Sequence, residues 1–348
     1  MRRIQRIHRQ VRYLSGQRRL VPLRFLGVLL LAALSLGACA ETSDESAADS
    51  ATVEAGWPAL QIVNVNEFPW DEPGRFGART KTFFRSDTGS FVYIRFFPTW
   101  DTDMPVERLG PHYHIFHEWV YVLGGDYVIH EPVSHYQRNP PLYRYVEGTW
   151  LDRPAYTIHN GTWATGGVRA QNPNTMILFE EGDSGVTIID PSKPSEPGAD
   201  DWRAVEQFAR PWIVDSGSAL EWEQDTEVAG RLLKWLSDDL KGGFRAQLVK
   251  IQPGWTAPEE SQKTYFEHAS KMRYMLYGDM LVWQFDDPAA AGTPVRVSED
   301  FYIHQSPRSI WGYGAGPLTE DGAVWLEVTY AKGLEHGGGP IEEAIAIH

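Results

Sequence analysis

The sequence of 348 residues contains a single cysteine, Cys39, so no disulfide can form within the chain. It also lacks an excess of basic residues, because the formal net charge is −14. Residues 1–38 contribute eight Arg and no acidic residue, which leaves −22 on the remainder of the chain. So acidic a body repels phosphate groups, and the charge therefore argues against nucleic acids and anionic membrane surfaces as partners.

The apolar run over residues 25–38 is too short to predict a transmembrane helix. It follows an Arg-rich leader, as the core of a signal peptide does. The run leads into LGAC (36–39), which resembles the lipobox of bacterial lipoproteins; the alternative is an ordinary signal peptide with a cysteine near its cleavage site. We therefore predict a signal peptide over 1–38, lipidation of Cys39 and a disordered, lipidated tether over 39–56. The protein is expected to be exported and lipid-anchored to a bacterial membrane, in the periplasm or on the cell surface.

Long stretches with helical periodicity are missing from residue 57 onward. Short β-branched and aromatic runs alternate instead with Gly, Pro, Asn and Asp, which is typical of strands in a sandwich or barrel. We predict strands over 91–97, 118–123, 126–131, 175–181 and 185–190. The Pro- and Ser-rich segment 191–201 predicts a linker. Residues 200–211 predict one short helix, because Asp opens the segment and Pro closes it.

The second half of the chain repeats the first. The pattern Tyr-x-Leu-x-Gly-Asp, followed by an apolar strand, occurs at 121–126 and again at 274–279. A period of about 153 residues indicates a duplicated domain and not a solenoid. We therefore predict domains at 57–190 and 216–340, joined by a linker over 191–215 that holds the short helix.

Three histidines and a glutamate fall within seven residues of one another. Because alternate residues of a strand point the same way, His112 and His114 lie on one face and Glu118 keeps their parity. His117 has the opposite parity and is predicted not to be a ligand. Neutral imidazoles with a carboxylate are a typical ligand set for a transition metal. A fourth ligand has to come from a facing strand, and His159 is the candidate; the alternative is a solvated histidine cluster in a loop.

At these residues the sequence resembles the cupin superfamily. The spacing Gly-x-His-x-His-x3-Glu-x6-Gly, from Gly110 to Gly125, is similar to the first cupin motif, and Gly148-x5-Pro-x4-His159 is similar to the second. The second motif departs from the family at Tyr156, where cupins usually have Gly. The resemblance implies an all-β fold of two tandem cupin (jelly-roll) barrels with short connecting helices, a bicupin. The repeats are distantly similar to anti-sigma-factor-type cupins and to dihydroxyacetophenone dioxygenase-like cupins.

Only the first barrel is predicted to bind metal. Alignment of the two repeats replaces the four candidate ligands by residues that do not form such a site, namely Tyr265, Glu267, Lys271 and Gly312. The strand pattern survives while the ligands are lost. We therefore interpret the second barrel as structural or substrate-shaping.

The resemblance also implies a cofactor and site residues. The cofactor is one divalent metal ion, Fe(II) first, with Zn, Mn or Ni as alternatives. Its predicted ligands are His112, His114, Glu118 and His159. In the preceding strand, Tyr93 and Arg95 share a face; if that face is inward, Arg95 can hold a substrate carboxylate or enolate and Tyr93 can donate a proton. An outward-facing pair is the alternative. Tyr156 is predicted to line the mouth of the site.

The activity that the resemblance favours is that of a metal-dependent dioxygenase, an oxidoreductase that cleaves a C–C bond in a small phenolic or diketone-like substrate. Alternatives are a non-redox isomerase or lyase acting on a sugar or uronate, and a non-catalytic ligand-binding cupin. The expected partners are a small-molecule substrate, O2 for a dioxygenase, and the membrane through the lipid anchor alone. No nucleic acid is expected, and a homodimer is compatible with the resemblance.

Overall fold

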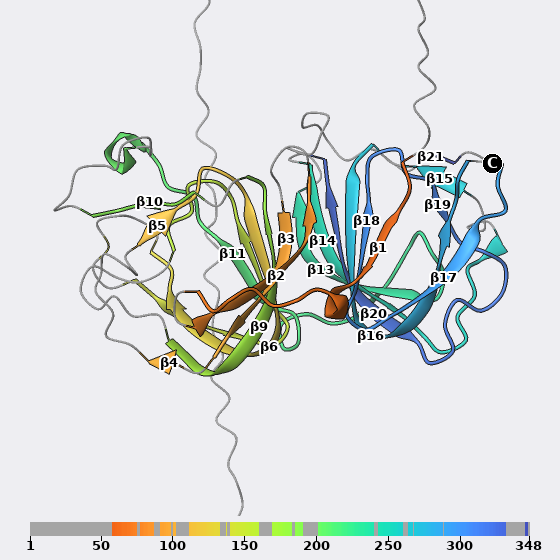
Figure 1. Ribbon diagram of the computed structural model, residues 1–348, viewed down its shortest axis with the longest axis horizontal. Helices are drawn as coiled ribbons and strands as arrows, with labels where there is room; N and C mark the ends of the chain where they lie inside the picture. The colour runs from red at the N-terminus through yellow and green to blue at the C-terminus, as the bar shows by residue number, and fades with distance from the viewer. Residues whose placement is uncertain are drawn as a thin grey trace, which may run out of the picture. The chain divides into compact units, whose positions relative to one another are not determined.

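The short β-rich runs fold into antiparallel sheets with very little helix (Figure 1). The computed structural model describes residues 58–74, 77–86, 91–98, 100–101, 111–132, 137, 140–159, 169–182, 185–190, 201–239, 243–259, 264–266, 268–287, 289–331 and 345–346. The predicted signal peptide, Cys39 and the tether lie outside these residues, as do residues 191–200 of the predicted linker. The part of the chain that the structure describes contains no helix long and apolar enough to cross a membrane.

One large sheet is built mainly from the first repeat. Its strands are β2 (Arg79–Arg85), β3 (Phe91–Phe97), β4 (Trp100–Asp101), β6 (Glu118–His130), β7 (Leu142–Val146), β8 (Thr149–Arg153), β9 (Arg169–Glu180) and β11 (Trp212–Asp215). Their order is β11-β8-β6-β9-β3-β2, with β4 paired to β9 and β7 paired to β6. The strand predicted over 91–97 is confirmed as β3, whereas those predicted over 118–123 and 126–131 form the single strand β6.

The other large sheet comes mainly from the second repeat. Its strands are β1 (Gln61–Asn64), β12 (Glu223–Gln224), β13 (Arg231–Asp239), β14 (Phe244–Ile251), β16 (Ser270–Gln284), β17 (Thr293–Ser298), β18 (Phe301–Gln305) and β20 (Ala323–Tyr330). Their order is β1-β18-β16-β20-β14-β13-β12, with β17 paired to β16. Two small sheets join β5 (His112–Tyr113) to β10 (Thr187–Ile188), and β15 (Thr264–Phe266) to β19 (Trp311–Gly312) and β21 (Ile345–Ala346).

Each half of the chain has one strand in the sheet of the other half. Strand β1, near the start of the folded part, pairs with β18, and β11, which precedes the second repeat, pairs with β8. The domain boundaries at 57–190 and 216–340 stay a prediction, but these two strand pairs connect the repeats across them. A single 3-10 turn, η1 (Val65–Glu67), follows β1.

The helix predicted over 200–211 is wrong. Only one turn of 3-10 helix forms there, η3 (Trp202–Ala204), where Asp201 accepts a hydrogen bond from the backbone N–H of Arg203. The capping residue is the expected one, yet the backbone does not continue as a helix. Its Ala209 N–H donates to the carbonyl of Tyr156, and β11 begins three residues later. These sheet-like contacts hold the segment extended after η3.

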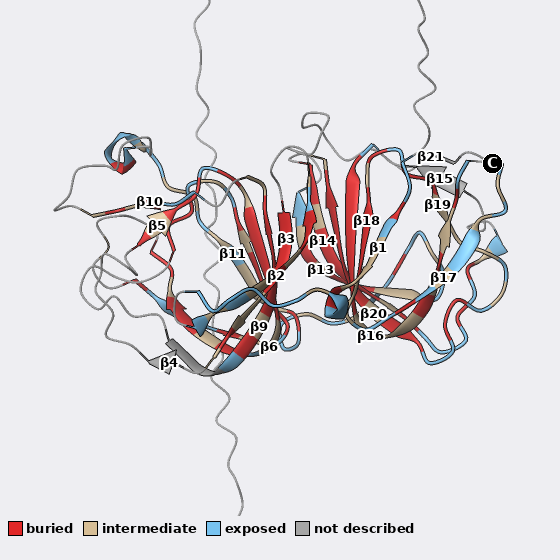
Figure 2. Cartoon of the chain, in the orientation of Figure 1, coloured by how far each residue is buried: buried red, intermediate tan, exposed pale blue. Residues whose placement is uncertain are grey.

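Alternation along the strands separates an inner from an outer apolar cluster. Tyr93 of β3 packs inside the first barrel, with inward residues that include Val120 and Leu178. Its neighbours Val92 and Ile94 pack outside the barrel, in a cluster shared with the second repeat. Figure 2 shows that β14, β18 and β20 are buried along most of their length, whereas β17 is largely exposed.

His304 is a buried histidine in the face that the two repeats share, and its ring stacks on Phe84 at 4.0 Å between centroids. Burial lowers the pKa of His304 from 6.5 to about 4. As the pH falls below 6.5, the unfolded chain gains a proton at His304 that the folded chain does not take up until about pH 4. The free energy of unfolding is therefore highest at neutral pH, and this histidine lowers it by about 3 kcal/mol as the pH falls from 6.5 to about 4.

We expect His304→Phe to remove this part of the pH dependence. Between pH 7 and pH 4, the free energy of unfolding measured with urea should fall by about 3 kcal/mol less in the variant than in the wild type. His268→Gln, a change at an exposed histidine of the same repeat, serves as the control. Parallel pH curves for His304→Phe and the wild type would contradict the prediction.

Candidate metal centre

Three imidazoles meet where β5 lies beside residues 157–159. His112 and His159 form a β-bridge, with N–H to carbonyl hydrogen bonds of 3.1 and 3.0 Å in the two directions. Their ring centroids are 4.3 Å apart, and the ring of His114 lies 5.4 Å from His112 and 5.1 Å from His159. One ligand atom of each histidine lies within 4.8 Å of the other two. This spacing fits three imidazole nitrogens around one metal ion.

Backbone carbonyls orient two of these rings. His114 Nδ1 lies 2.8 Å from the carbonyl oxygen of Gly185, and His159 Nδ1 lies 3.0 Å from that of Thr157. Because a carbonyl oxygen only accepts hydrogen bonds, Nδ1 donates in both rings and Nε2 keeps its lone pair. This arrangement of an outer carbonyl and an inner free nitrogen is the usual one for metal-binding histidines.

His159 is held neutral by its surroundings. Burial is the largest cause that lowers its pKa well below the usual value, and the positive charge of Arg153 lowers that pKa further. Neutral imidazole is the form that binds a metal ion. The donor set therefore fits the cofactor that the sequence predicts.

Glu118 is the first residue of β6 and lies beside the histidines. It is not part of the cluster of ligand atoms that the three histidines form. Its Oε2 lies 3.7 Å from His114 Nε2, while its Oε1 accepts a hydrogen bond from Arg153 Nη1 at 2.5 Å. Burial would raise the pKa of Glu118, but the charge of Arg153 and the hydrogen bond that Arg153 donates lower it below its usual value. Glu118 is thus an ionised carboxylate with one oxygen toward His114, and its role as a fourth ligand stays a prediction.

Arg153 and Glu131 form a buried network that sequence reasoning missed. Arg153 Nη2 donates to Glu131 Oε1 at 2.7 Å, and the hydroxyl of Tyr145 donates to the same carboxylate. Burial is the main reason why the pKa of Glu131 is raised. The one signal in the sequence was the parity of Arg153, which matches that of the inward residue Leu151 in β8. In the structure, Arg153 pairs in register with Glu118.

Tyr93 and Arg95 face the interior of the barrel, which decides between the two orientations that the sequence left open. Tyr93 is 1% exposed, and its hydroxyl donates to Glu180. The Arg95 guanidinium lies 4.9 Å from the Tyr93 ring and 5.9 Å from the Phe97 ring. Burial, followed by the charge of Glu180, keeps the pKa of Tyr93 well above its usual value. The phenol therefore retains its proton; the roles of both residues stay predictions.

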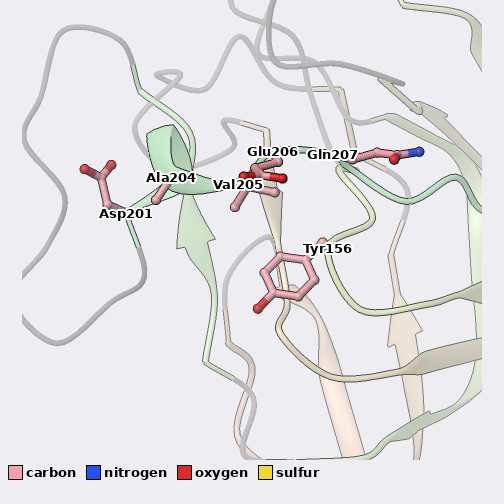
Figure 3. A pocket seen from close by; sticks show the side chains of 6 residues that line it. All are labelled: Tyr156, Asp201, Ala204, Val205, Glu206 and Gln207. Atoms are coloured by element: carbon pink, nitrogen blue, oxygen red, sulfur yellow. The ribbon is translucent and has the colours of Figure 1, made fainter. Parts of the chain in front are cut away.

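Tyr156 occupies a position that glycine usually fills. Its φ is +66°, in the left-handed region that disfavours side chains, which explains why the related motif has Gly there. Its N–H donates to the carbonyl of His114 at 2.7 Å, and its ring packs 5.5 Å from that of Tyr113. Tyr156 lines a pocket of about 430 Å³ together with residues from the segment 201–207. Figure 3 shows these side chains. The ring thus lies on the Tyr113 side of β5, and a role at the mouth of the metal site stays a prediction.

Comparison with known proteins agrees with this architecture. No protein-family model and no curated protein match the chain. A solved structure from Nostoc punctiforme, described provisionally as a dioxygenase, superposes with a TM-score of 0.54 at 14% identity over 83% of this chain and 87% of that one. A deletion variant of Bacillus subtilis oxalate decarboxylase superposes with a TM-score of 0.51 at 11% identity, over 82% of this chain and 79% of that one.

The chain has the fold of a bicupin. At these identities the likeness concerns the fold, and the site has to be argued from the residues. Fold and histidine cluster together support a metal-dependent cupin.

Within the described part of this bicupin, the histidine cluster occurs in the first barrel alone. Strand register agrees with the predicted correspondence of Lys271 to Glu118, because Lys271 pairs with Gln305 as Glu118 pairs with Arg153. The predicted counterpart of His159 is shifted by one residue. His112 pairs with His159, and its counterpart Tyr265 pairs with Trp311 and not with the predicted Gly312. Neither residue offers a metal ligand, so the interpretation of the second barrel is unchanged. Glu267 lies outside the described residues.

Proposed function

We propose that this bicupin is a metal-dependent dioxygenase that cleaves a C–C bond in a small, anionic phenolic or diketone-like substrate. The three grouped imidazoles and the adjacent carboxylate supply a ligand set suited to Fe(II), with Zn, Mn or Ni as alternatives. A site with few protein ligands leaves open positions for substrate and O2.

The observation that carries the proposal is the Arg95 side chain. Its guanidinium makes no hydrogen bond and no ion pair with the described residues, and it lies over the aromatic rings of Tyr93 and Phe97. Glu118 and Glu180 attract it electrostatically, but Arg153 and Tyr93 already bond to these two carboxylates. A partly buried guanidinium without an acceptor is stabilised by an anionic ligand, which it can bind through two parallel hydrogen bonds.

The chain's own residues then have distinct tasks. Arg95 binds and orients the anionic oxygens of the substrate, and Tyr93 holds its proton at the phenol oxygen, ready for transfer to an oxyanion. Arg153 keeps Glu118 ionised beside His114. A bound divalent ion would supply Lewis-acid chemistry and, if redox-active, activation of O2.

Elemental analysis of the purified protein, read beside an O2 electrode trace over a panel of small phenolics and diketones, tests the proposal. Iron together with substrate-dependent O2 uptake supports it. Turnover of a sugar or uronate with Zn, Mn or Ni and no O2 uptake would replace it by the isomerase or lyase activity. Tight ligand binding without any product would replace it by a binding function.

Replacing Arg95 by glutamine should weaken catalysis mainly through substrate binding. Hydrogen bonds to a charged group contribute about 1.5–3 kcal/mol, so we expect kcat/KM to fall about 10- to 100-fold, with a raised KM. Arg85→Gln is the matched control, since Arg85 also lies over an aromatic ring, that of Phe91, but is exposed. Equal kcat/KM values for the two variants would show that Arg95 does not bind the substrate.

Export and lipid anchoring remain part of the proposal and rest on residues outside the described part of the chain. Loss of the protein from the membrane fraction in Cys39→Ser would support the anchor, and unchanged fractionation would contradict it. A homodimer stays a prediction, which the molar mass in solution decides.

A further inference from the structure

His117 lies between two candidate ligands in a segment, residues 114–117, that belongs to no strand. Three contacts hold it. Its N–H donates to Glu181 Oε2 at 3.1 Å, and its carbonyl accepts from the Glu181 N–H at 3.0 Å. Its ring Nε2 lies 2.6 Å from Asp152 Oδ1. The conformation of the segment is therefore set by neighbours outside it.

The contacts of His117 continue into the second repeat. Asp152 Oδ2 accepts a hydrogen bond from Ser237 Oγ at 3.0 Å, and Ser237 Oγ accepts one from Trp150 Nε1 at 2.9 Å. The ring of His117 also meets that of Phe244 edge-on, at 4.7 Å between centroids. A hydrogen-bonded chain thus runs from the segment that carries the ligands, through Asp152, to strand β13 of the other barrel.

A β-bulge places Ser237 at this point. The register between β13 and β14 shifts between Trp235 and Ser237. A bulge leaves one residue out of the ladder and re-aims its neighbours. The residue left out is Leu236, whose carbonyl accepts a hydrogen bond from Trp212 Nε1 of β11 at 2.6 Å. Leu236 and Ser237 therefore make three hydrogen bonds to strands of the first sheet, two with β8 and one with β11.

The duplicated half of the interface offers a comparison within the same molecule. Strand β2 has the equivalent bulge, which ends at Phe84 as that of β13 ends at Ser237. Lys271 pairs with Gln305 in the second repeat, and Glu118 pairs with Arg153 in the first. His304 and Asp152 each come one residue before these partners, so His304 occupies the position equivalent to Asp152. There the contact is a ring stack, Phe84 on His304. Packing of the two barrels therefore does not require a chain of polar contacts. The polar contacts occur on the side of the interface that adjoins the ligand segment.

We infer that Ser237 and Asp152 are positioning residues through which the second barrel fixes the ligand segment of the first. By holding His117, they limit the movement of His114 on one side and of Glu118 on the other. This inference rests on the proposed metal centre, and it assigns a task to the barrel that has no ligands of its own. Loss of a group hydrogen-bonded directly to a ligand typically costs about 10- to 100-fold in metal affinity, and residues that act through His117 should fall at the lower end of that range.

The test uses the full chain loaded with Co(II), whose visible spectrum reports ligand geometry, and follows release of Co(II) to a chelator. We expect Ser237→Ala to alter the spectrum and to release Co(II) about 10-fold faster, and Ser237→Thr, which keeps the hydroxyl, to restore the wild-type rate. Ser218→Ala is the matched control. It removes an exposed serine that donates to a carboxylate, Asp215, at 2.6 Å and does not contact His117.

A double-variant cycle separates positioning from general destabilisation. If Ser237 acts through His117, Ser237→Ala should add no further acceleration in a His117→Ala chain. Additive effects, or equal release rates for Ser237→Ala and Ser218→Ala, would overturn the inference while leaving the metal centre intact. A wild-type protein that binds no Co(II) would instead overturn the proposed centre itself.

Discussion

Replacing His114 by alanine should leave the protein without its metal. The His114 ring contributes one of three grouped imidazoles, and its Nδ1 is already committed to the carbonyl of Gly185, which leaves Nε2 for the ion. Removing a direct ligand should weaken binding by more than about 100-fold, because losing even an outer partner costs 10- to 100-fold. Elemental analysis after gel filtration should fall from near one metal per chain to near zero.

His117→Ala is the matched control, only three residues away. Its ring faces Asp152 and the second barrel instead of the three imidazoles. The variant should still bind one metal per chain at saturation, although it should release that metal faster. If His114→Ala and His117→Ala both retain stoichiometric metal, the assignment of the centre is wrong.

Adding a methyl group at Gly125 should prevent stable folding. Gly125 has φ of +81°, and a Cβ at this position would lie 1.9 Å from the carbonyl oxygen of Pro173, far closer than any real contact. Because the obstacle is backbone inside a sheet, no side chain can move aside to relieve it. The left-handed conformation alone costs an alanine roughly 1–2 kcal/mol. With the clash, we expect Gly125→Ala to lose more than about 4 kcal/mol, a large share of a typical folding free energy.

The adjacent glycine provides the control. A Cβ at Gly124 would have no neighbouring atom within 4 Å, and Gly124 is not in the left-handed region, so Gly124→Ala should change stability by less than about 1 kcal/mol. Gly278, the counterpart in the second repeat, would clash with the Gly322 carbonyl at the same 1.9 Å, and Gly278→Ala should behave like Gly125→Ala. Urea unfolding and soluble yield measure the differences. Similar unfolding curves for Gly124→Ala and Gly125→Ala would refute the argument.

Strand positions followed from local pattern, and so did much of the site. Strand β3 has the predicted bounds because its flanking turn residues end it on both sides. The parity of His112 and His114, together with the spacing of His159 from Gly148 and Pro154, predicted which imidazoles meet. Orientation of the Tyr93 face was beyond the sequence, because both faces of β3 are apolar and both are buried, one in the barrel and the other against the second repeat.

Long-range contacts were the part that local pattern did not contain. The pairing of β1 with β18 joins residues far apart in the chain, and nothing in the short run QIVN names its partner. The helix predicted over 200–211 failed for a related reason, since its extended backbone is fixed by contacts with Tyr156 and by the start of β11. The Arg153–Glu131 pair joins the end of β8 to the residue that follows β6, and the sequence around either residue does not specify this contact.

The two crossing strands also bear on how this gene arose. A chain cut between residues 190 and 201 would keep its halves together, because β1 would remain hydrogen-bonded to β18 and β11 to β8. Two identical subunits that exchange strands in this way are a domain-swapped dimer, and fusing them makes the subunit interface internal. Identical subunits must mutate together, whereas fused copies are free to diverge. A fused pair can therefore keep the histidines in one half and lose them in the other, as the two halves of this chain do.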